Sequence, residues 1–408
     1  MNKKVFLVVM AGLLCSKGLL AEEAAKSYTS GEVVVTSSRV EESKKNVTTN
    51  VTVISKEEIR QSSAQDLGSL LAEKNIGYIH KYPGTLTTIG IRGFRTDTHG
   101  NDLRSKVLVL LNGRRAGTGN LAKISTGNIE RIEILRGPAA VQYGSAAIGG
   151  VVNVITAKGS GHPGLFLEQT IGSNEYTQTT LGATGKTGHF DFSGRVSFSE
   201  MGDYKTGSER VYRNAGYDDL TAGSVNVGYE FMPGHRVGVI YSYFKVGHEG
   251  MPNYLNQNDL DDYGVKKNYS TDFIYEGATP DKSFSWMARF FTGRDEDLSF
   301  DPAASNPDGW DDGGAPFRAR TDNKGAQAQV TYNHDVFRAT AGVDWVKYDE
   351  HRTLYAPFLS GYDNLGYFLM LNGYLMDRTL VLSAGFRHDS YEDRKSTRLN
   401  SSHLAESR

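Results

Sequence analysis

The chain has 408 residues, enough for two or three domains, and its 46 glycines, 22 tyrosines and 18 phenylalanines favour sheet and turn over an all-helical protein. The formal net charge is -2, so no broad basic surface is expected for binding the phosphates of a nucleic acid. The only cysteine is Cys15, which leaves the remaining chain without a disulfide or a cysteine-based metal site.

Residues 1–21 have the form of a secretory signal peptide. Lys3 and Lys4 precede an apolar run from Val5 to Leu14, and small residues follow before an acidic patch at Glu22 and Glu23. We expect cleavage after Ala21. Beyond this segment no apolar run reaches about 18 residues, so the sequence predicts no membrane-spanning helix and leaves strands as the means of crossing a membrane.

A short β-prone run, Glu32-Val33-Val34-Val35-Thr36, follows the signal peptide and is flanked by residues that favour disorder. Val51 to Ile54 then predicts a strand, and Ser55-Lys56-Glu57-Glu58 fits a capping box at the start of a helix. A second, weaker helix start at Ser63 to Asp66 precedes a leucine-rich segment. Together these elements predict a small α+β domain.

Three further blocks belong to the same domain. They read IGIRGF from Ile89 to Phe94, VLVLLNG from Val107 to Gly113, and IERIEILRGPAAVQYGSAAIGGVVNVIT from Ile129 to Thr156. The last places two β-rich runs around a turn of glycine, proline and small residues. The segment from Gly159 to Gly164 formally fits a dinucleotide-binding pattern, but it follows no βαβ unit and contains Pro163, so we interpret it as a hinge.

After Gly164 the sequence changes to strict alternation of apolar and polar residues. Phe190, Phe192, Val196 and Phe198 alternate with polar residues, and about ten other segments up to Tyr391 repeat the pattern. Short turns at about 185–187, 232–235, 277–282, 334–335 and 377–378 alternate with long polar loops at about 201–219, 247–267, 293–323 and 348–365. This asymmetry is typical of an outer-membrane barrel, whereas a soluble β-sandwich has no reason to keep its long loops on one side.

In order and spacing the three blocks resemble the plug domain of TonB-dependent outer-membrane receptors, over about residues 31–160. The resemblance implies a β fold: a small α+β plug within a transmembrane antiparallel β-barrel of the 22-stranded type, in the Gram-negative outer membrane. It divides the chain into a signal peptide (1–21), a periplasmic tether (22–45), the plug (46–160) and a partial barrel (161–394). About eleven strands are half of such a barrel. The alternation is lost from Lys395, so residues 395–408 are interpreted as a non-native tail on a truncated gene.

The resemblance also assigns roles to particular residues. Glu32, Val33, Val34, Val35 and Thr36 resemble the TonB box, which an energy-coupling partner captures by adding it as a strand to its own sheet. Arg92 and Arg136, next to Gly93 and Gly137, are expected to be largely buried, where an unpaired guanidinium is costly. They would pair with inward-facing barrel carboxylates and hold the plug in register; a lock that loosens on energisation is the alternative.

Ligand contacts in this family come from the apical loops of the plug and from the outer loops. That assigns His80, Tyr82 and Thr85 in the first apical loop and Arg115, Thr118 and Asn120 in the second. Asp259, Asp261 and Asp262, with Asp218 and Asp219, form acidic clusters that suit calcium, while solvated loop tips are the alternative. No other cofactor is expected.

The sequence carries no HExxH or GxSxG motif, so we expect no enzyme. The expected function is TonB-dependent transport of a scarce, large ligand by a monomer surrounded by outer-membrane lipid, with the TonB complex as its partner. A ferric siderophore is the first candidate and cobalamin the second. Four alternatives stay open: a heme receptor that uses His80 and His248, a passive porin, a non-transporting binding protein or adhesin, and a soluble carbohydrate-binding sandwich.

Overall fold

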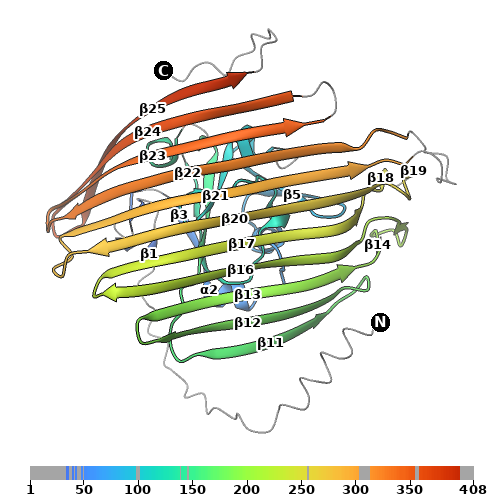
Figure 1. Ribbon diagram of the computed structural model, residues 1–408, viewed down its shortest axis with the longest axis horizontal. Coiled ribbons are helices and arrows are strands. Elements are labelled where there is room, and N and C mark those ends of the chain that lie inside the picture. Colours follow the sequence, from blue (N-terminus) through green and yellow to red (C-terminus); the bar gives the residue numbers. More distant parts are fainter. Residues whose placement is uncertain are drawn as a thin grey trace. The chain divides into compact units, whose positions relative to one another are not determined.

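The computed structural model describes residues 34–35, 39–40, 42–43, 47–48, 50–97, 102–137, 139–144, 147–254, 257–302, 313–353 and 358–395. Within these ranges the chain forms a mixed α/β domain at its N-terminal side, followed by a large antiparallel sheet (Figure 1). The N-terminal domain is called the plug below. Its elements lie between Val51 and Thr156.

Two short strands, β1 (Val34–Val35) and β2 (Glu42–Ser43), pair antiparallel ahead of the plug. The plug elements are β3 (Val51–Ser55), α2 (Lys56–Arg60), α3 (Leu67–Glu73), β4 (Tyr78–Tyr82), β5 (Leu86–Ile91), β6 (Phe94–Arg95), η2 (Asp102–Arg104), β7 (Val107–Leu111), β8 (Arg114–Arg115), η3 (Leu121–Lys123), β9 (Ile129–Leu135), α4 (Ala140–Tyr143) and β10 (Gly150–Thr156).

The two predicted helix starts have different outcomes. Ser55 caps α2 through a complete capping box with Glu58, as the sequence predicts. Helix α3 begins at Leu67, and its N-cap is Asp66, whose carboxylate accepts a hydrogen bond from the Ser69 amide. The cap is therefore the last residue of the predicted start Ser63 to Asp66, and Ser63 itself lies too far from the first helical turn to serve as the cap.

The plug core is built on a five-stranded sheet in the order β3-β9-β10-β7-β8. One of its faces packs against Leu67, Leu70 and Leu71 of α3, and the other packs against Ala139 and Tyr143 around α4. Every residue of β7 is buried. An apolar run without alternation is what a strand covered on both faces requires, which explains the sequence from Val107 to Leu111.

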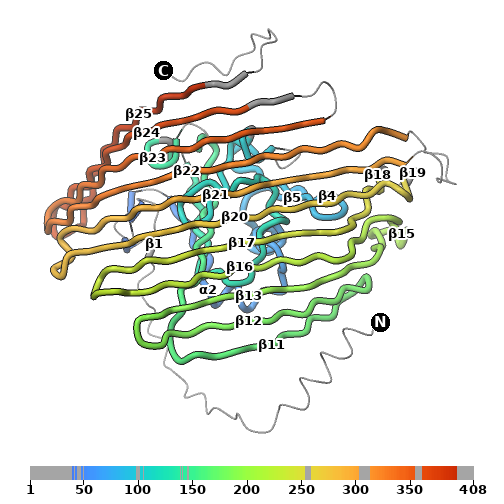
Figure 2. The backbone as a smooth tube through the Cα atoms, viewed as in Figure 1, coloured from blue at the N-terminus to red at the C-terminus, as the bar shows by residue number. Residues whose placement is uncertain are grey.

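The large sheet contains eleven strands, as the sequence predicts, in chain order from edge to edge (Figures 1 and 2). They are β11 (Gly164–Ile171), β12 (Thr177–Thr187), β13 (Phe190–Met201), β16 (Tyr217–Met232), β17 (His235–Gly250), β20 (Tyr263–Ala278), β21 (Phe284–Phe300), β22 (Phe317–Asn333), β23 (Phe337–Arg352), β24 (Phe358–Leu375) and β25 (Leu380–Lys395). Two small hairpins lie in connections: β14 (Tyr204–Lys205) with β15 (Val211–Tyr212), and β18 (Asn253–Tyr254) with β19 (Gln257–Asn258).

The connections at the two ends of the sheet differ in length, but less regularly than predicted. Those at residues 188–189, 233–234, 279–283, 334–336 and 376–379 have two to five residues, and those at 202–216, 251–262 and 301–316, at the other end, are longer. At that same end, however, the connections 172–176 and 353–357 have only five residues each, because β23 and β24 continue into the segment that the sequence predicts to be a long loop. In these strand ends both faces carry polar side chains, so the backbone ladder continues after the apolar alternation has stopped.

The hinge prediction corresponds to a segment between β10 and β11. A side chain at Gly159 would place its Cβ 2.3 Å from the backbone of Gly185 and Phe192, so only glycine fits there. No helix of the described residues is long and apolar enough to cross a membrane.

Candidate functional site

The chain that leads into the plug is fixed by Arg39, which the sequence analysis did not single out. Its guanidinium donates two hydrogen bonds to the Asp344 carboxylate on β23, at 2.8 and 2.7 Å. The same group lies 4.4 Å from the ring centroid of Phe368 on β24, and the Arg39 carbonyl accepts a hydrogen bond from Gln329. Neither side chain of the Arg39–Asp344 ion pair is more than 10% exposed. Solvent therefore weakens the attraction between the two charges only a little.

Glu42 makes a second attachment three residues later. Its carboxylate pairs with Arg338 at 2.9 Å and accepts a hydrogen bond from the Tyr374 hydroxyl at 2.7 Å. Glu42 is only 5% exposed. We call Arg39 and Glu42, with Asp344, Arg338 and Tyr374, the N-terminal clamp, because together they tie the segment that precedes the plug to β23 and β24.

The predicted TonB box adjoins this clamp. Val34 and Val35 form β1, and they pair with Ser43 and Glu42 respectively. Glu32, Val33 and Thr36 lie outside the described residues. The described part of the run is therefore a strand that is already paired on one edge with the segment held by Glu42.

Arg92 and Arg136 are exposed, so the expectation that the plug buries them is wrong. Arg92 stands in the tight turn between β5 and β6 with a φ of 54°, next to Gly93 at 80°, and Gly137 follows Arg136 at 153°. These turns bring both side chains to the periphery of the plug. Within the described ranges neither arginine forms an ion pair with a carboxylate of the large sheet.

Two other plug cations make the buried pairs. Arg114, on β8, donates to both oxygens of Asp272 on β20 at 2.6 Å and to the Ser270 hydroxyl at 2.8 Å. Burial alone would lower the pKa of Arg114, but the attraction of Asp272 outweighs it and raises that pKa. The guanidinium is therefore charged at every accessible pH, and it fixes the plug to this strand.

Lys123, in η3, lies between two carboxylates of β21. Its Nζ is 2.7 Å from Asp295 and 2.7 Å from Asp297, and its side chain has no exposed surface. Burial lowers the pKa of Lys123, and the two carboxylates more than compensate, so the pKa is raised. The sequence signal for this residue was weak, because one lysine after a small-residue loop is common on any surface.

The residues proposed to contact the ligand fall into two groups. Thr85, Thr118 and Asn120 are buried and serve the plug itself. The Asn120 side chain accepts hydrogen bonds from the amides of Thr87 and Ala122 and donates to the Thr85 carbonyl. The Thr85 amide donates to Glu249 at the end of β17, so this apical turn is attached to the large sheet.

The remaining members of that set keep more accessible side chains. His80 is exposed, Tyr82 is half-buried, and their rings stack at 4.2 Å on β4. Arg115 is 3.8 Å from Asp102, a carboxylate that also accepts a hydrogen bond from Tyr348. Burial raises the pKa of Asp102, although Arg115 opposes that effect. His80 with Tyr82, and Arg115 with Asp102, thus form two separate groups in the plug.

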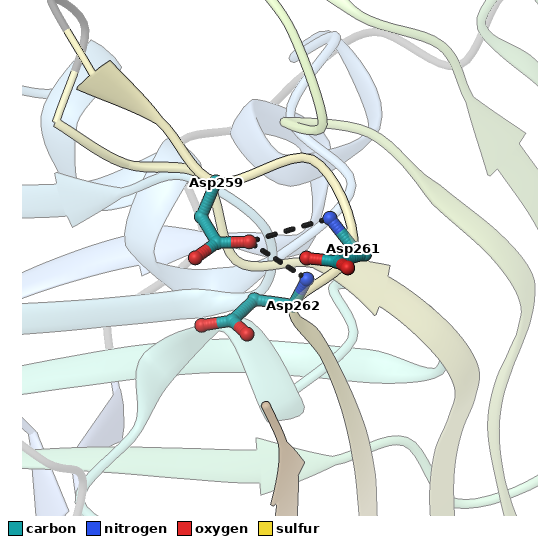
Figure 3. A group of neighbouring side chains, drawn as sticks. All are labelled: Asp259, Asp261 and Asp262. Carbon is teal, nitrogen blue, oxygen red and sulfur yellow. Dashed lines mark hydrogen bonds between the residues drawn. The ribbon is translucent and has the colours of Figure 1, made fainter. Parts of the chain in front are cut away.

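Asp259, Asp261 and Asp262 come together in the connection between β19 and β20 (Figure 3). One oxygen from each lies within 4.8 Å of the others. Asp259 is buried, and its carboxylate accepts hydrogen bonds from the amides of Asp261 and Asp262. Burial and the neighbouring Asp261 raise the pKa of Asp259, against those amide bonds. Asp218 and Asp219 are exposed on β16 and are not members of the group.

Comparison with known proteins supports the assignment of both parts. Residues 43–151 match the model of the TonB-dependent receptor plug domain. The vitamin B12 transporter BtuB of Photobacterium profundum is 34% identical over 197 residues, which are 46% of this chain and 30% of that protein. BtuB of Vibrio vulnificus is 33% identical over 192 residues, covering 45% and 30%. The chain thus spans less than a third of these curated relatives.

Solved structures extend the likeness to the large sheet. The copper transporter OprC has a TM-score of 0.70 at 17% identity, over 87% of this chain and 58% of that one. The FrpB iron transporter of Neisseria meningitidis has a TM-score of 0.68 at 15% identity, over 84% and 59%. At such identities the likeness concerns the fold alone. Residues 43–151 thus carry a TonB-dependent receptor plug domain, and the eleven-stranded sheet that follows has a fold similar to part of these solved structures.

Proposed function

We propose that this protein acts in energy-coupled uptake of a scarce, large ligand across the outer membrane, with the TonB complex as its periplasmic partner. The observation that carries the proposal is the way the plug is fixed to the face of the sheet by buried ion pairs at Arg114 and Lys123. A domain held by desolvated charges leaves its place only when work is done on it. A passive pore has no use for such a plug.

The N-terminal clamp gives this work a route. The partner captures Glu32 to Thr36 by strand addition, and traction along β1 then reaches Glu42 and Arg39 before it reaches the plug core. Asp344 has a second cation, Arg387, at 2.7 Å, so it stays paired when Arg39 leaves. The clamp therefore opens at a lower cost than the Arg114 pair, and it is the first contact to yield.

For the ligand, the curated relatives alter the order in which the candidates are tested. The family resemblance by itself favours a ferric siderophore first and cobalamin second. The relatives with 34% and 33% identity are vitamin B12 transporters, so cobalamin moves to first place and a ferric siderophore becomes the comparison ligand. His80, Tyr82 and Arg115 are the plug side chains assigned to ligand contact. Thr85, Thr118 and Asn120 are buried, and they shape the plug loops rather than contact the ligand.

Calcium belongs to the same proposal as a stabiliser of the outer connection. Asp259, Asp261 and Asp262 offer the hard oxygen ligands that calcium prefers, and a cation would favour the ionised form of Asp259 against the burial and the neighbouring Asp261 that raise its pKa. Terbium luminescence with the full chain tests this: the signal should be competed by calcium and lost in Asp259→Asn. An unchanged signal in that variant would remove calcium from the proposal.

The main experiment measures ligand binding and growth separately. The full chain in detergent should bind cyanocobalamin more tightly than a ferric siderophore, and Tyr82→Ala with Arg115→Ala should weaken that binding. A strain that lacks the gene should then grow poorly on limiting cobalamin and normally on limiting iron. Siderophore binding with an iron-dependent growth defect would reverse the order of the two ligands.

Deletion of Glu32 to Thr36 separates transport from mere binding. A strain whose only copy of the gene carries this deletion should lose cobalamin-dependent growth. The deleted protein should still bind cyanocobalamin as the parent does. Growth that survives the deletion would favour a passive porin, and a binding function without any growth phenotype would favour an adhesin. Heme as the tighter ligand, lost in His80→Ala, would favour the heme receptor.

A further inference from the structure

A β-bulge near the end of β17 brings Glu249 to the plug side of the large sheet. From Ile240 to Val246 the even-numbered side chains of β17 lie on that side, because they are in register with β20 residues such as Ser270 and Asp272, which reach the plug. Side chains alternate along a strand, so an uninterrupted β17 would turn Glu249 away from the plug. Between Val246 and Glu249, however, β17 has one residue more than β20. The extra residue reverses the alternation, and Glu249 faces the plug.

The carboxylate of Glu249 is enclosed by partners from the plug and from the sheet. It accepts hydrogen bonds from the Thr85 amide, at 2.9 Å, and from the Thr85 hydroxyl, and it forms an ion pair with Lys266 on β20. Glu249 is only 2% exposed. Two glycines leave room for it: a Cβ at Gly264 would lie 3.1 Å from its Cγ, and a Cβ at Gly84 would lie 3.2 Å from its Cδ. Hydrogen bonds to a charged acceptor are stronger than neutral ones, so this contact holds the plug firmly.

The plug segment that Glu249 holds is the turn of residues 83–85, which joins β4 to β5. All three polar groups of Thr85 are engaged. Its amide and hydroxyl donate to Glu249, and its carbonyl accepts a hydrogen bond from the Asn120 side chain. Gly84 has a φ of 73°, which glycine adopts at little cost. The turn is therefore held from the sheet by Glu249 and from the plug itself by Asn120.

This turn fixes the end of β4, which carries two of the side chains assigned to ligand contact. His80 and Tyr82 stack with their ring centroids 4.2 Å apart, and Tyr82 is the last residue of the strand. In its three-stranded sheet β4 is an edge strand that pairs with β5 alone. An edge strand with few contacts opens locally at low cost. The position of the two rings thus depends on how firmly the turn is held.

Glu249 also adjoins two outer connections of the sheet. The amide of the next residue, Gly250, donates to the Gly216 carbonyl, and the Met251 amide donates to the Asp262 carbonyl. These bonds join the end of β17 to the connections at 202–216 and 251–262. Glu249 is therefore the point at which the turn of the plug and the outer connections are tied together.

We propose that Glu249 is a positioning residue for ligand binding. Through Thr85 it keeps His80 and Tyr82 in a fixed place relative to the outer connections. A ligand that contacts a prearranged site binds more tightly, because less freedom is lost when the complex forms. The inference rests on the proposed function, in which His80 and Tyr82 contact the ligand.

The test uses the full chain in a neutral detergent with cyanocobalamin as the probe. Glu249→Gln removes the charge that holds Thr85 and Lys266, and its affinity should fall about ten-fold, the equivalent of about 1.4 kcal/mol. Thr85→Val removes the hydroxyl donor and should weaken binding by a similar factor. In the double variant the two losses should not add, because both changes remove the same contact.

The matched control is Glu276→Gln. Glu276 is also a carboxylate of β20 that pairs with a lysine, Lys158 in the segment after the plug, but it lies at the opposite end of the sheet from Glu249. Its removal should leave the affinity for cyanocobalamin unchanged. Additive losses in the Glu249 and Thr85 double variant, or an equal loss in the control, would overturn the role of Glu249.

Amide exchange in the ligand-free chain distinguishes positioning from a damaged fold. Glu249→Gln should exchange faster than the parent in residues 83–91 and at the same rate in β7, which is buried in the plug core. Saturating cyanocobalamin should slow the exchange in residues 83–91 again. Unchanged exchange there, or faster exchange in β7 as well, would contradict the proposal.

Two binding results separate this inference from the function on which it rests. If the parent bound cyanocobalamin and Glu249→Gln bound it equally well, the role of Glu249 alone would fail. If the parent bound neither cyanocobalamin nor a ferric siderophore, the proposed function would fail and the role of Glu249 with it.

Discussion

At the scale of single residues, the buried carboxylates differ in whether a second cation stays close when one ion-pair partner is removed. Asp344 faces Arg39 and also Arg387, each at 2.7 Å. Asp272 has Arg114 at 2.6 Å, whereas its other cation, Arg289, is 3.7 Å away. A buried charge that loses its only close partner costs more than one that keeps another.

Arg114→Met should therefore lower the free energy of unfolding by about 3–5 kcal/mol, the usual cost of leaving a buried charge uncompensated. Arg39→Met should cost about 1.5–3 kcal/mol, the value of hydrogen bonds to a charged group. Urea unfolding of the full chain in detergent measures both.

Lys56→Met serves as the control for these two variants. It removes an exposed pair with Glu130, in which the side chains are 51% and 41% exposed. Such a pair should contribute no more than about 1 kcal/mol. If Arg114→Met cost as little as Lys56→Met, Asp272 would not be an obligatory partner, and the plug would be held by other contacts.

At the scale of elements, the capping box of α2 links stability to pH. The backbone amide and the hydroxyl of Ser55 donate to Glu58 and lower its pKa below the ordinary value of 4.5. Folding thus favours the ionised carboxylate. Its contribution is complete above pH 4.5 and is lost as the pH falls through the folded-state pKa.

The difference in unfolding free energy between the parent and Glu58→Ala should therefore be constant from pH 5 to pH 8 and shrink on acidification. Ser55→Ala, which removes the hydroxyl of the cap, should cost about 1 kcal/mol at neutral pH. Chemical denaturation at a series of pH values measures both. A difference for Glu58→Ala that grows toward low pH would contradict the assigned direction.

The N-terminal clamp is the element on which the proposed traction acts. Removal of its charges in the double variant Arg39→Gln with Glu42→Gln should speed amide exchange in residues 34–43, since β1 has β2 as its pairing strand and β2 is held by Glu42. Exchange in β7 should not change, because that strand is buried in the plug core. Mass spectrometry of the deuterated chain separates the two regions.

The exposed pair Lys205 and Glu209 provides the comparison for this measurement. Lys205→Gln with Glu209→Gln also removes two charges, but in an outer connection that has no link to the clamp. If this variant accelerated exchange at 34–43 as much, the effect would reflect overall charge. Uniformly faster exchange in the clamp variant, β7 included, would mean that the clamp supports the whole plug.

At the scale of the whole molecule, the parts read correctly from the sequence are those with a repeating pattern. Apolar residues alternate with polar ones at Phe190, Phe192, Val196 and Phe198, and this pattern predicts β13 because one face of the strand meets an apolar environment and the other a polar one. The unbroken apolar run at β7 marks a strand covered on both sides. Each pattern is local, so one sequence is enough to detect it.

The contacts of the candidate site are harder to predict from the sequence because they join residues that are far apart in the chain. Arg39 and Asp344 are separated by 305 positions, and Arg114 and Asp272 by 158. Nothing local distinguishes Arg114, which is buried, from Arg92, which stands exposed in a turn. Burial of a cation follows from where the large sheet places a carboxylate, and that placement depends on strand register rather than on neighbouring sequence.

Two tryptophans of the described strands, Trp286 on β21 and Trp345 on β23, lie on the sheet face opposite the plug, and they provide a test of how the sheet is placed in a membrane. Trp345 is near the middle of β23, in register with Ala326, and Trp286 is in register with Gly277 near the short turn between β20 and β21. At about 3.3 Å per residue and a tilt of about 40°, Trp286 lies about 5–8 Å and Trp345 about 20–23 Å from the short turns, so the two should lie near opposite edges of an apolar band about 25 Å tall.

Single-tryptophan variants make this prediction measurable in bilayers. With Trp310→Phe as the background, Trp286→Phe leaves only Trp345, and Trp345→Phe leaves only Trp286. Lipids brominated near the headgroup should quench each tryptophan more strongly than lipids brominated deep in the acyl chain, since quenching requires close approach. Aromatic side chains near the edges of the band prefer the interface, which reinforces this order. Absence of quenching by lipids brominated at any depth would mean that this face of the sheet does not meet the lipid.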